Sequence, residues 1–338
     1  MKFIHLADCH LADSFNFDKN LSSKIRNASW KSLETIFKDN KDVDFALIAG
    51  DLFERSYFSS RDFHRLFSII RDFSKDVYYV SGNHDYFDDY NYLFLKESPT
   101  NFHVFGSSEI EVFESEGLRI YGISYDDRIF DKKVNLNINL DDKFFNIFLV
   151  HGEIDNINSN YFSLDSGEIS LERFDYIAMG HIHKKGSYKN IYYSGSIEPH
   201  DFSDIYDYGY IRYEDGKVNF IDSSILKFYD FSINFSDYNS YENLISYLNS
   251  KLRDDKRNFV RININSHENI DKSLIRKNLQ ADFLDIRLNE EKSLDEFVRL
   301  FPNSLLSMYN EKFHGKTDEA SLLARKIGLD AILRSRDD

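Results

Sequence analysis

Five short polar clusters contain most of the residues of this sequence that could perform chemistry, and each follows directly after an apolar run. They are Asp8-Cys9-His10, Gly50-Asp51, Gly82-Asn83-His84-Asp85, His151-Gly152 and Gly180-His181-Ile182-His183. Their carboxylate, amide and imidazole groups are ligand types that bind divalent cations. The set therefore predicts a site for two adjacent metal ions, which is a type of site that hydrolyses phosphoesters.

The spacing within the clusters suggests how the ligands divide between the two ions. Because alternate residues of a strand face the same side, Asp8 and His10 are expected to meet one ion while Cys9 points into the core. The two carboxylate oxygens of Asp51 make it the natural bridging ligand. One ion is expected to bind Asp8, His10, Asp51 and His183, and the other Asp51, Asn83, His151 and His181.

The mixed nitrogen and oxygen ligand set suits manganese, iron or zinc better than calcium, with manganese as the first expectation and magnesium as a further alternative. Two such ions lie roughly 3.5 to 4 Å apart and activate a bridging water for in-line attack on phosphorus. His84 is the expected catalytic residue, which stabilises the developing charge or protonates the leaving oxygen. Asp85 is expected to orient His84.

Taken singly, these motifs have simpler interpretations. A lone Gly-Asn-His-Asp can form a turn, and a lone His-x-His can lie in a surface loop. Five clusters that all follow apolar runs favour the metal site, because open α/β sheets bind ligands at the carboxyl ends of their strands.

The elements that must position the clusters alternate between strands and helices. Strands are expected at 2–7, 45–49 and 77–80, with helices at 26–37 and from Ser59 or Ser60, where the buried face would be Phe63, Leu66, Phe67 and Ile70. Segments with an antiparallel appearance follow at 102–105, 110–113 and 118–124, with a turn at Glu116-Gly117. Further strands are expected at 145–150, 176–179, 191–194 and 208–213. This pattern is typical of a layered α/β domain with a largely parallel sheet.

The histidine-rich spacing stops after about residue 213. The next residues predict a separate small α/β unit, with strand, helix, strand, helix and strand at 227–235, 241–252, 258–265, 272–279 and 283–288. From about Ser293 the pattern is helical, with interruptions at Pro302 and Gly315 and a last helix that Thr317 could cap. The predicted domains are 1–222, 227–290 and 293–338.

Composition limits the classes of protein that this chain can be. With 42 Lys and Arg against 57 Asp and Glu, the net charge is −15, which opposes unaided attraction to nucleic acid. The single cysteine excludes an internal disulfide, and no apolar run approaches the roughly 20 residues of a membrane span. A cytoplasmic protein without membrane contact is therefore expected.

The set and order of the clusters resemble the calcineurin-like metallophosphoesterase superfamily, over about residues 1 to 213. The opening 3–11, the 49–53 strand end, the 179–183 loop and Tyr193-Ser194-Gly195-Ser196-Ile197-Glu198-Pro199 resemble its DNA-repair nuclease branch. That branch includes SbcD, YhaO-type proteins and the nuclease subunit of the MRN complex. By this resemblance the metal ligands fall on Asp8, His10, Asp51, Asn83, His151, His181 and His183, and the catalytic histidine falls on His84.

The resemblance implies a four-layer α/β/β/α phosphoesterase domain, followed by a small capping domain that 227–290 would form. It implies hydrolysis of DNA phosphodiester bonds, as exonuclease or endonuclease in DNA repair. It also implies an SMC-like coiled-coil ATPase partner of the SbcC type, for which residues 293–338 are the candidate contact. Ala320, Leu323, Ala324 and Ile327 form the amphipathic run that motivates this, although a helix packed on its own domain fits as well. Homodimers are common in the family.

One residue departs from the pattern of the branch. The third position after the bridging aspartate is often His in its archaeal and eukaryotic members, whereas here it is Glu54, which places a negative charge near the phosphate path. Basic groupings occur beyond Asp51 and His183, and they fit a DNA path and a solvated surface equally well. They are Arg55, Arg61, Arg65, Lys184, Lys185 and Lys189.

Two rival functions remain open at this point. One is a phosphoesterase for a small nucleotide or lipid-linked substrate. The other is a DNA-bridging or regulatory subunit without catalysis, which the presence of His84 opposes. His200 follows the Ser194-Gly195-Ser196 loop and is a minor candidate for substrate contact.

Overall fold

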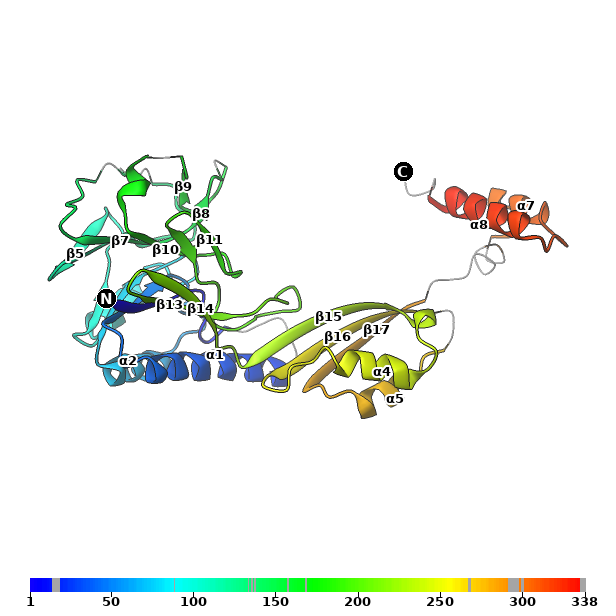
Figure 1. Cartoon of the computed structure of the whole chain (residues 1–338), viewed down its shortest axis with the longest axis horizontal. Coiled ribbons are helices and arrows are strands. Elements are labelled where there is room, and N and C mark those ends of the chain that lie inside the picture. Colours follow the sequence, from blue (N-terminus) through cyan, green and yellow to red (C-terminus); the bar gives the residue numbers. More distant parts are fainter. Residues whose placement is uncertain are drawn as a thin grey trace. The chain divides into compact units, whose positions relative to one another are not determined.

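The computed structural model (Figure 1) describes residues 1–13, 19–87, 89–132, 134, 136, 138–156, 158–167, 169–266, 269–290, 298 and 301–334. The chain divides into two compact units. The first comprises Met1–Tyr229 with Arg253–Phe259, and the second comprises Asp230–Leu252 with Val260–Asp338. All five polar clusters belong to the first unit.

The first sheet has six strands in the order β14-β13-β1-β2-β3-β4. Four strands run parallel, namely β1 (Lys2–Leu6), β2 (Phe45–Ala49), β3 (Asp76–Val80) and β4 (Phe102–Val104). The sheet is completed by β13 (Gly209–Glu214) and β14 (Lys217–Asp222), and β13 pairs antiparallel with both β1 and β14. The antiparallel expectation for 102–105 is wrong, because a helical crossover after β3 lets β4 pair parallel to it.

The second sheet also has six strands, in the order β11-β12-β10-β7-β6-β5. Its parallel strands are β6 (Leu118–Gly122), β7 (Phe145–His151), β10 (Tyr176–Gly180) and β12 (Ile191–Tyr193). Antiparallel strands at its edges are β5 (Glu111–Ser115) and β11 (Gly186–Tyr188). The predicted turn joins β5 to β6 through Gly117, whose φ of +71° suits glycine. Two mixed sheets thus form the α/β architecture of this unit.

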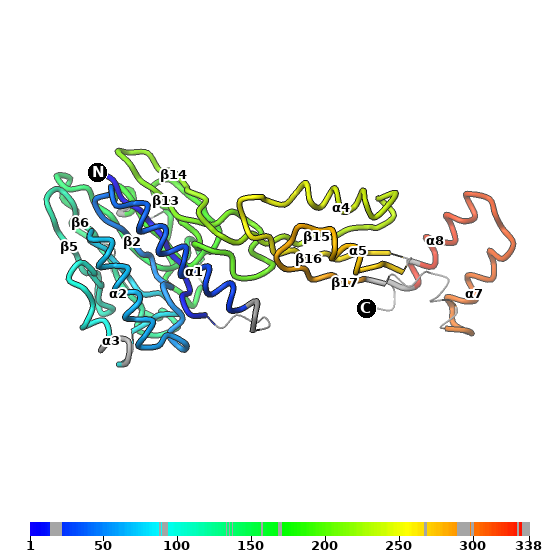
Figure 2. The backbone as a smooth tube through the Cα atoms, turned by 90° about the horizontal axis from the view of Figure 1, so that it is seen from below, coloured from blue at the N-terminus to red at the C-terminus, as the bar shows by residue number. Residues whose placement is uncertain are grey.

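Helices α1 (Lys19–Asp39), α2 (Ser60–Phe73) and α3 (Asp89–Lys96) connect strands of the first sheet. Ser59 caps α2 in a reciprocal capping box with Asp62, which satisfies backbone N–H groups at the helix start. The predicted face of α2, with Phe63, Leu66 and Phe67, is buried. Figure 2 shows α1 and α2 side by side over this sheet.

Strand alternation separates two hydrophobic clusters on opposite faces of the first sheet. Ile4 and Leu6 pack in the cluster that contains the buried side chains of α1 and α2. Phe3, on the other face, belongs to the cluster between the two sheets, together with Ile120 and Leu149 of the second sheet. The two sheets therefore pack face to face, with helices on the outer face of the first.

The outer face of the second sheet carries a third cluster, which includes Phe148 and Ile177. Among the described residues, this face is covered by loops, the short β8 (Glu153–Ile154) and β9 (Ser163–Leu164), and the 3-10 helix η1 (Ile169–Arg173). The expected second α layer is thus absent from the described part of the chain. Apolar residues at 134, 136, 138 and 140 recur with period two, which does not favour an α-helix.

The small unit contains the three-stranded sheet β15-β16-β17. Its elements are β15 (Leu226–Asn234), η2 (Phe235–Asp237), α4 (Tyr241–Asn249), β16 (Arg257–Ser266), α5 (Lys272–Asn278) and β17 (Phe283–Glu290). Their order matches the predicted strand and helix alternation. Figure 1 shows α4 and α5 on one side of this sheet.

Two further helices, α7 (Leu305–Glu311) and α8 (Glu319–Arg334), pack against each other. The predicted cap of α8 at Thr317 is wrong, because the carboxylate of Asp318 accepts the N–H of Ser321 at 2.9 Å. The rest of the predicted segment 293–338, namely 293–297, 299–300 and 335–338, lies outside the described residues. Among the helices described, none combines the length and the apolar character needed to cross a membrane.

Candidate metal centre

The polar clusters meet at one edge, where parallel strands of both sheets end. Asp8 follows β1, Asp51 follows β2 and Asn83 follows β3 in the first sheet. His151 is the last residue of β7, and His181 follows β10 in the second sheet. The face-to-face packing of the sheets brings these strand ends together, so one site receives side chains from both layers.

The backbone of the site is left-handed at several residues that are not glycine. The φ angles are 49° at Asp8, 41° at His10, 49° at Asp51 and 93° at His181. β1 ends at Leu6, so Asp8 and His10 do not converge by strand alternation as the sequence suggested. They converge because the chain turns after the strand, a backbone arrangement that concentrates at functional sites.

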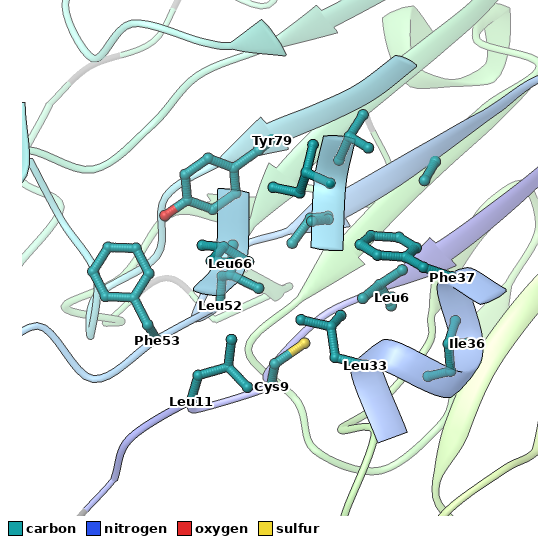
Figure 3. Close-up of a cluster of buried hydrophobic side chains, with 14 of the residues drawn as sticks. Leu6, Cys9, Leu11, Leu33, Ile36, Phe37, Leu52, Phe53, Leu66 and Tyr79 are labelled. Atoms are coloured by element: carbon teal, nitrogen blue, oxygen red, sulfur yellow. The ribbon is translucent and has the colours of Figure 1, made fainter. Parts of the chain in front are cut away.

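Cys9 points away from the site and is fully buried in the helix-covered core. Figure 3 shows its sulfur among the side chains of Leu11, Leu33 and Leu52. The nearby His5 is also fully buried, with its Nδ1 3.0 Å from the hydroxyl of Tyr176. Both residues therefore lie in the packed interior.

Asp51 lies at the centre of the site. Its Oδ2 is 3.3 Å from Nε2 of His151 and 3.8 Å from Nε2 of His10. Its other oxygen accepts the backbone N–H of His84 at 2.9 Å. The carboxylate is shared by two groups of potential ligands, one with His10 and His84 and the other with His151 and His181. This position fits a carboxylate that bridges two cations.

His151, Asn83 and His181 direct lone pairs toward a common point. His151 donates its Nδ1–H to the carbonyl of Ala49 at 2.9 Å, so Nε2 of the neutral ring carries a lone pair. That Nε2 is 3.1 Å from Oδ1 of Asn83, and Nδ1 of His181 lies 3.2 Å from the same oxygen. Because acceptor atoms that face one another repel, a cation between them is the arrangement that these residues fit.

The carboxylate of Glu153 fixes the orientation of His181. Its Oε1 accepts a hydrogen bond from Nε2–H of His181 at 3.2 Å, which leaves the lone pair of Nδ1 to face Asn83. Histidines that bind metals commonly donate their second ring N–H to a carboxylate or carbonyl in this way. Ala49 holds His151 by the same principle, so both imidazoles are prepared to act as ligands.

The second group gathers around His10. Its Nε2 is 3.3 Å from Nε2 of His183, and the ring nitrogens of His10, His183 and His200 all lie within 4.8 Å of one another. The carboxylate of Asp8 accepts the backbone N–H of His181 at 3.0 Å and lies 4.0 Å from Nδ1 of His151. The seven residues predicted as ligands are thus gathered at one site.

The charges of the site favour a bound cation. Burial lowers the pKa of His151, but the charge of Asp51 outweighs burial and raises this pKa to about 9. Burial also raises the pKa of Asp51, yet His151 and His10 hold it below its ordinary value. The negative charge that retains a proton here also attracts a metal ion, which must displace that proton to bind.

His84 is paired with Glu54. Its Nδ1 lies 2.6 Å from Oε2 of Glu54, and its side chain is 33% exposed. Burial lowers the pKa of His84, but the bond to Glu54 and the charge of Asp51 outweigh it, so the pKa is raised. The expectation that Asp85 orients His84 is wrong. Asp85 is buried and accepts the N–H groups of Gly82 at 2.6 Å and Leu52 at 2.6 Å, which holds the two loops together.

Glycine at position 82 permits the close approach of the loops. A Cβ on Gly82 would lie 2.3 Å from Oδ1 of Asp51 and 2.8 Å from Nε2 of His151. Such contacts are too short for carbon, so the side chains at the centre would have to move. The glycine of the 82–85 cluster is therefore required by packing against Asp51.

Sequence reasoning missed two carboxylates that support the imidazoles. Glu153 contacts His181, and Asp204 lies 3.9 Å from Nδ1 of His183. Each carboxylate is more than 20 positions from its partner in the sequence, so no local spacing reveals the pair. Glu54 was recognised only as a departure from the family pattern, although it is the partner of His84.

The basic groupings differ in how they are engaged. Arg65 is paired with Glu34 at 2.8 Å, and Lys189 is paired with Glu172 at 2.7 Å. The Nζ atoms of Lys184 and Lys185 lie over the rings of Tyr206 and Phe220, at 4.2 and 3.8 Å from the ring centres. These two lysines directly follow His183, one of the predicted metal ligands.

Comparisons with known proteins point to the same chemistry. Residues 1–185 match the family of calcineurin-like phosphoesterases. The chain is also similar to the SbcD component of the SbcCD nuclease from Staphylococcus epidermidis, with 24% identity over 249 residues. That alignment covers 61% of this chain and 63% of the relative, so this chain matches somewhat less than two thirds of the relative's length.

Proposed function

Because the chain belongs to the calcineurin-like phosphoesterase family, we propose that it is a dimetal-dependent phosphodiesterase that hydrolyses DNA. The observation that carries this proposal is the position of Asp51 between two groups of imidazoles. A single carboxylate with ligands on both sides is what two adjacent cations require. The nuclease assignment is supported by the distant similarity to the SbcD component of the staphylococcal nuclease.

The proposed ligands are those that the site gathers. One ion would be held by Asp8, His10, Asp51 and His183, and the other by Asp51, Asn83, His151 and His181. Manganese fits this mixed set of nitrogen and oxygen ligands well, as do iron and zinc. When bound, two such ions neutralise phosphate charge and lower the pKa of water at the site.

The residues of the chain then handle the leaving group. Glu54 accepts the Nδ1–H of His84 at 2.6 Å, which fixes the tautomer and leaves Nε2 available to the substrate. The raised pKa of His84 favours its cationic form, which can donate a proton to the leaving oxygen. We assign His84 as the catalytic residue and Glu54 as its positioning residue.

Binding of DNA requires positive charge near the site, because the net charge of −15 repels a polyanion. Lys184 and Lys185 supply positive charge beside the His183 loop. Their ammonium groups lie over aromatic rings, which orders the side chains through cation–π contacts. The unit around 227–290 is the proposed cap that helps to define the DNA path.

The proposed partner is a coiled-coil ATPase of the SbcC type, which would bind the α7–α8 hairpin. Leu305, Met308, Leu323 and Ile327 of the hairpin are all at least 58% exposed. Apolar side chains at this exposure on paired helices are typical of protein interfaces. A homodimer of the phosphoesterase unit is also compatible with the proposal.

A nuclease assay tests the function directly. The full chain with Mn²⁺ should cleave DNA of defined ends and a generic aryl phosphodiester. Asp51→Asn and His84→Ala should each reduce the rate by about a hundredfold or more. The exposed His64→Ala is the matched control and should leave both rates unchanged. The assay is repeated with a candidate coiled-coil ATPase to measure partner dependence.

The outcomes separate the alternatives. Hydrolysis of the aryl ester without cleavage of single- or double-stranded DNA would reject the DNA substrate and favour a small phosphodiester. Tight DNA binding without any hydrolysis would favour a regulatory role. Unchanged hydrolysis in Asp51→Asn would contradict the dimetal mechanism itself.

A further inference from the structure

A third imidazole lies beside His10 and His183 and belongs to no ligand assignment above. The ring of His200 is nearly perpendicular to both, with ring centres 4.9 Å from His10 and 5.0 Å from His183 and interplanar angles of 86° and 87°. The coordinating nitrogens of the three rings lie within 4.8 Å of one another. The three rings therefore converge on one small volume.

The backbone fixes His200 in this place. Ser196, which lies between β12 and His200, pairs with Ala7 at the end of β1. The N–H of Ser196 also donates to the carbonyl of His183 at 3.0 Å. The segment that carries His200 is thus attached both to the chain just after β1, which leads into Asp8 and His10, and to the loop that carries His183.

One carboxylate supports both His183 and His200. Asp204 accepts the backbone N–H of His200 at 2.8 Å and faces Nδ1 of His183 at 3.9 Å. Because Asp204 lies on the Nδ1 side of the His183 ring, Nε2 of His183 faces His10. Carboxylates that hold metal-binding imidazoles from behind have this arrangement.

The spacing of the His10 and His183 nitrogens fits ligands of one ion, and a nitrogen of His200 lies within 4.8 Å of both. Two ligands that each bind at about 2.0 to 2.2 Å lie roughly 3 Å apart around an ion. Nε2 of His10 and Nε2 of His183 are 3.3 Å apart. We propose that His200 is a third imidazole ligand of the ion held by His10 and His183, an inference that rests on the proposed dimetal function.

Burial distinguishes this role from contact with substrate. His200 is 8% exposed, whereas the side chain of His84, the proposed catalytic residue, is 33% exposed. A group that contacts DNA must be accessible from solvent. His200 is instead covered and close to the two other rings, like His10, a proposed ligand of the same ion whose side chain is 5% exposed.

A third imidazole makes the two metal positions chemically unequal. The first would have imidazoles from His10, His183 and His200, whereas the second has His151, His181 and the amide of Asn83. Because imidazole suits iron, zinc and similar transition metals better than it suits magnesium, the first position should exclude magnesium more strongly. The chain would then require a transition metal in one position and tolerate other metals in the second.

Calorimetric titration of the full chain with Mn²⁺, without substrate, tests the assignment. The unmodified protein should bind two ions. His200→Ala should weaken one of the two binding steps by about tenfold or more and leave the other within about twofold. Pulsed EPR of the Mn²⁺-loaded proteins should show fewer coupled nitrogens in His200→Ala. The exposed His64→Ala is the control and should match the unmodified protein in both measurements.

Each outcome decides the question. Two unchanged binding steps and an unchanged nitrogen count in a folded His200→Ala protein would overturn the ligand role. If only the affinity for inorganic phosphate is weaker in that variant, His200 contacts substrate and is not a ligand. If His200→Ala does not fold, the same titration is made with His200→Gln. The number of coupled nitrogens in the EPR spectrum of the unmodified protein then decides whether a third imidazole binds the ion. An unmodified protein that does not bind two ions would overturn the proposed function itself, which distinguishes that failure from an error about His200 alone.

Discussion

At the scale of single residues, the site depends on carboxylates that hold imidazoles in one orientation. Glu153 fixes His181, Glu54 fixes His84, and the carbonyl of Ala49 fixes His151. Each of these partners accepts a hydrogen bond from one ring N–H and leaves the other ring nitrogen for a metal or a substrate. The chemistry of the centre is therefore set as much by these partners as by the ligands.

The pair of Glu54 and His84 leads to a prediction about rate and pH. Glu54→Gln keeps a hydrogen-bonding group but removes the charge that raises the pKa of His84. If protonated His84 is the acid, activity falls as the pH rises through its pKa. Without the charge this fall should begin at lower pH, and kcat should decrease by about tenfold to a hundredfold with little change in KM. The measurement is the pH profile of aryl phosphodiester hydrolysis.

Glu34→Gln is the matched control, because it removes a carboxylate that pairs with Arg65 away from the site. Its pH profile should match that of the unmodified protein. A Glu54→Gln protein with the same alkaline limb as the unmodified protein would show that Glu54 does not act through His84.

At the scale of elements, one buried carboxylate connects a helix, a loop and a strand. Glu198 accepts a hydrogen bond from Ser32 of α1 and from the backbone N–H groups of Ile225 and Leu226, at the start of β15. It lies two residues before His200 and is fully buried. These contacts attach the loop that carries His200 to its neighbouring elements.

Glu198 gives a prediction about stability and pH. Burial raises the pKa of Glu198 from 4.5 to about 7, although its three donors oppose the rise. The folded state thus keeps this proton to higher pH than the unfolded state, so the stability that Glu198 contributes is present below pH 4.5 and is lost as the pH rises through about 7. The loss is on the order of 3 kcal/mol.

Glu198→Gln stays neutral at every pH and should lack this loss. In urea unfolding of the metal-free protein, the variant should be less stable than the unmodified protein at pH 5, because one acceptor is lost. The difference in the free energy of unfolding between the two proteins should be smaller at pH 8. Glu172→Gln, which alters an exposed pair with Lys189, is the control and should show a difference independent of pH. A difference that widens with pH would mean that the donors keep Glu198 ionised.

At the scale of the whole molecule, the candidate metal centre belongs to the first unit and a helical hairpin belongs to the second. Tyr309 of α7 donates to the carbonyl of Ala324 of α8 at 3.1 Å, and Leu329 is fully buried. Leu323 and Ile327 are 58% and 60% exposed. The hairpin thus forms its own contacts and still presents apolar side chains to solvent.

The exposed residues give a prediction about assembly. Leu323→Glu with Ile327→Glu should weaken binding to a candidate coiled-coil ATPase by about tenfold or more, because charged groups would have to be buried at the interface. Hydrolysis of the aryl phosphodiester by the chain alone should not change. Binding is measured by calorimetry with the purified ATPase.

Lys326→Glu is the control on the same helix, since Lys326 is exposed and already charged. Full binding by the double variant, or an equal loss with Lys326→Glu, would reject a specific apolar contact through α8. Deletion of 317–338 should have the same effect as the double variant on ATPase binding.

The sequence by itself determined which residues gather at the centre and at which ends of which strands. Strands of the first unit and the alternation of the small unit were predictable because apolar runs and caps such as Ser59 are local signals. The five clusters each follow such a run, so their common edge followed from the rule for open α/β sheets. The parallel pairing of β4 was not predictable, since pairing depends on a distant strand.

Only the tertiary structure decided which atoms of these residues face one another. The partners of His84, His181 and His183 lie more than 20 positions away along the chain, so sequence spacing did not assign them. The convergence of Asp8 and His10 depends on left-handed backbone, which local strand geometry does not anticipate. Local preferences act over a few residues, whereas the site is assembled by the packing of two sheets, and that packing also brings His200 to His10 and His183.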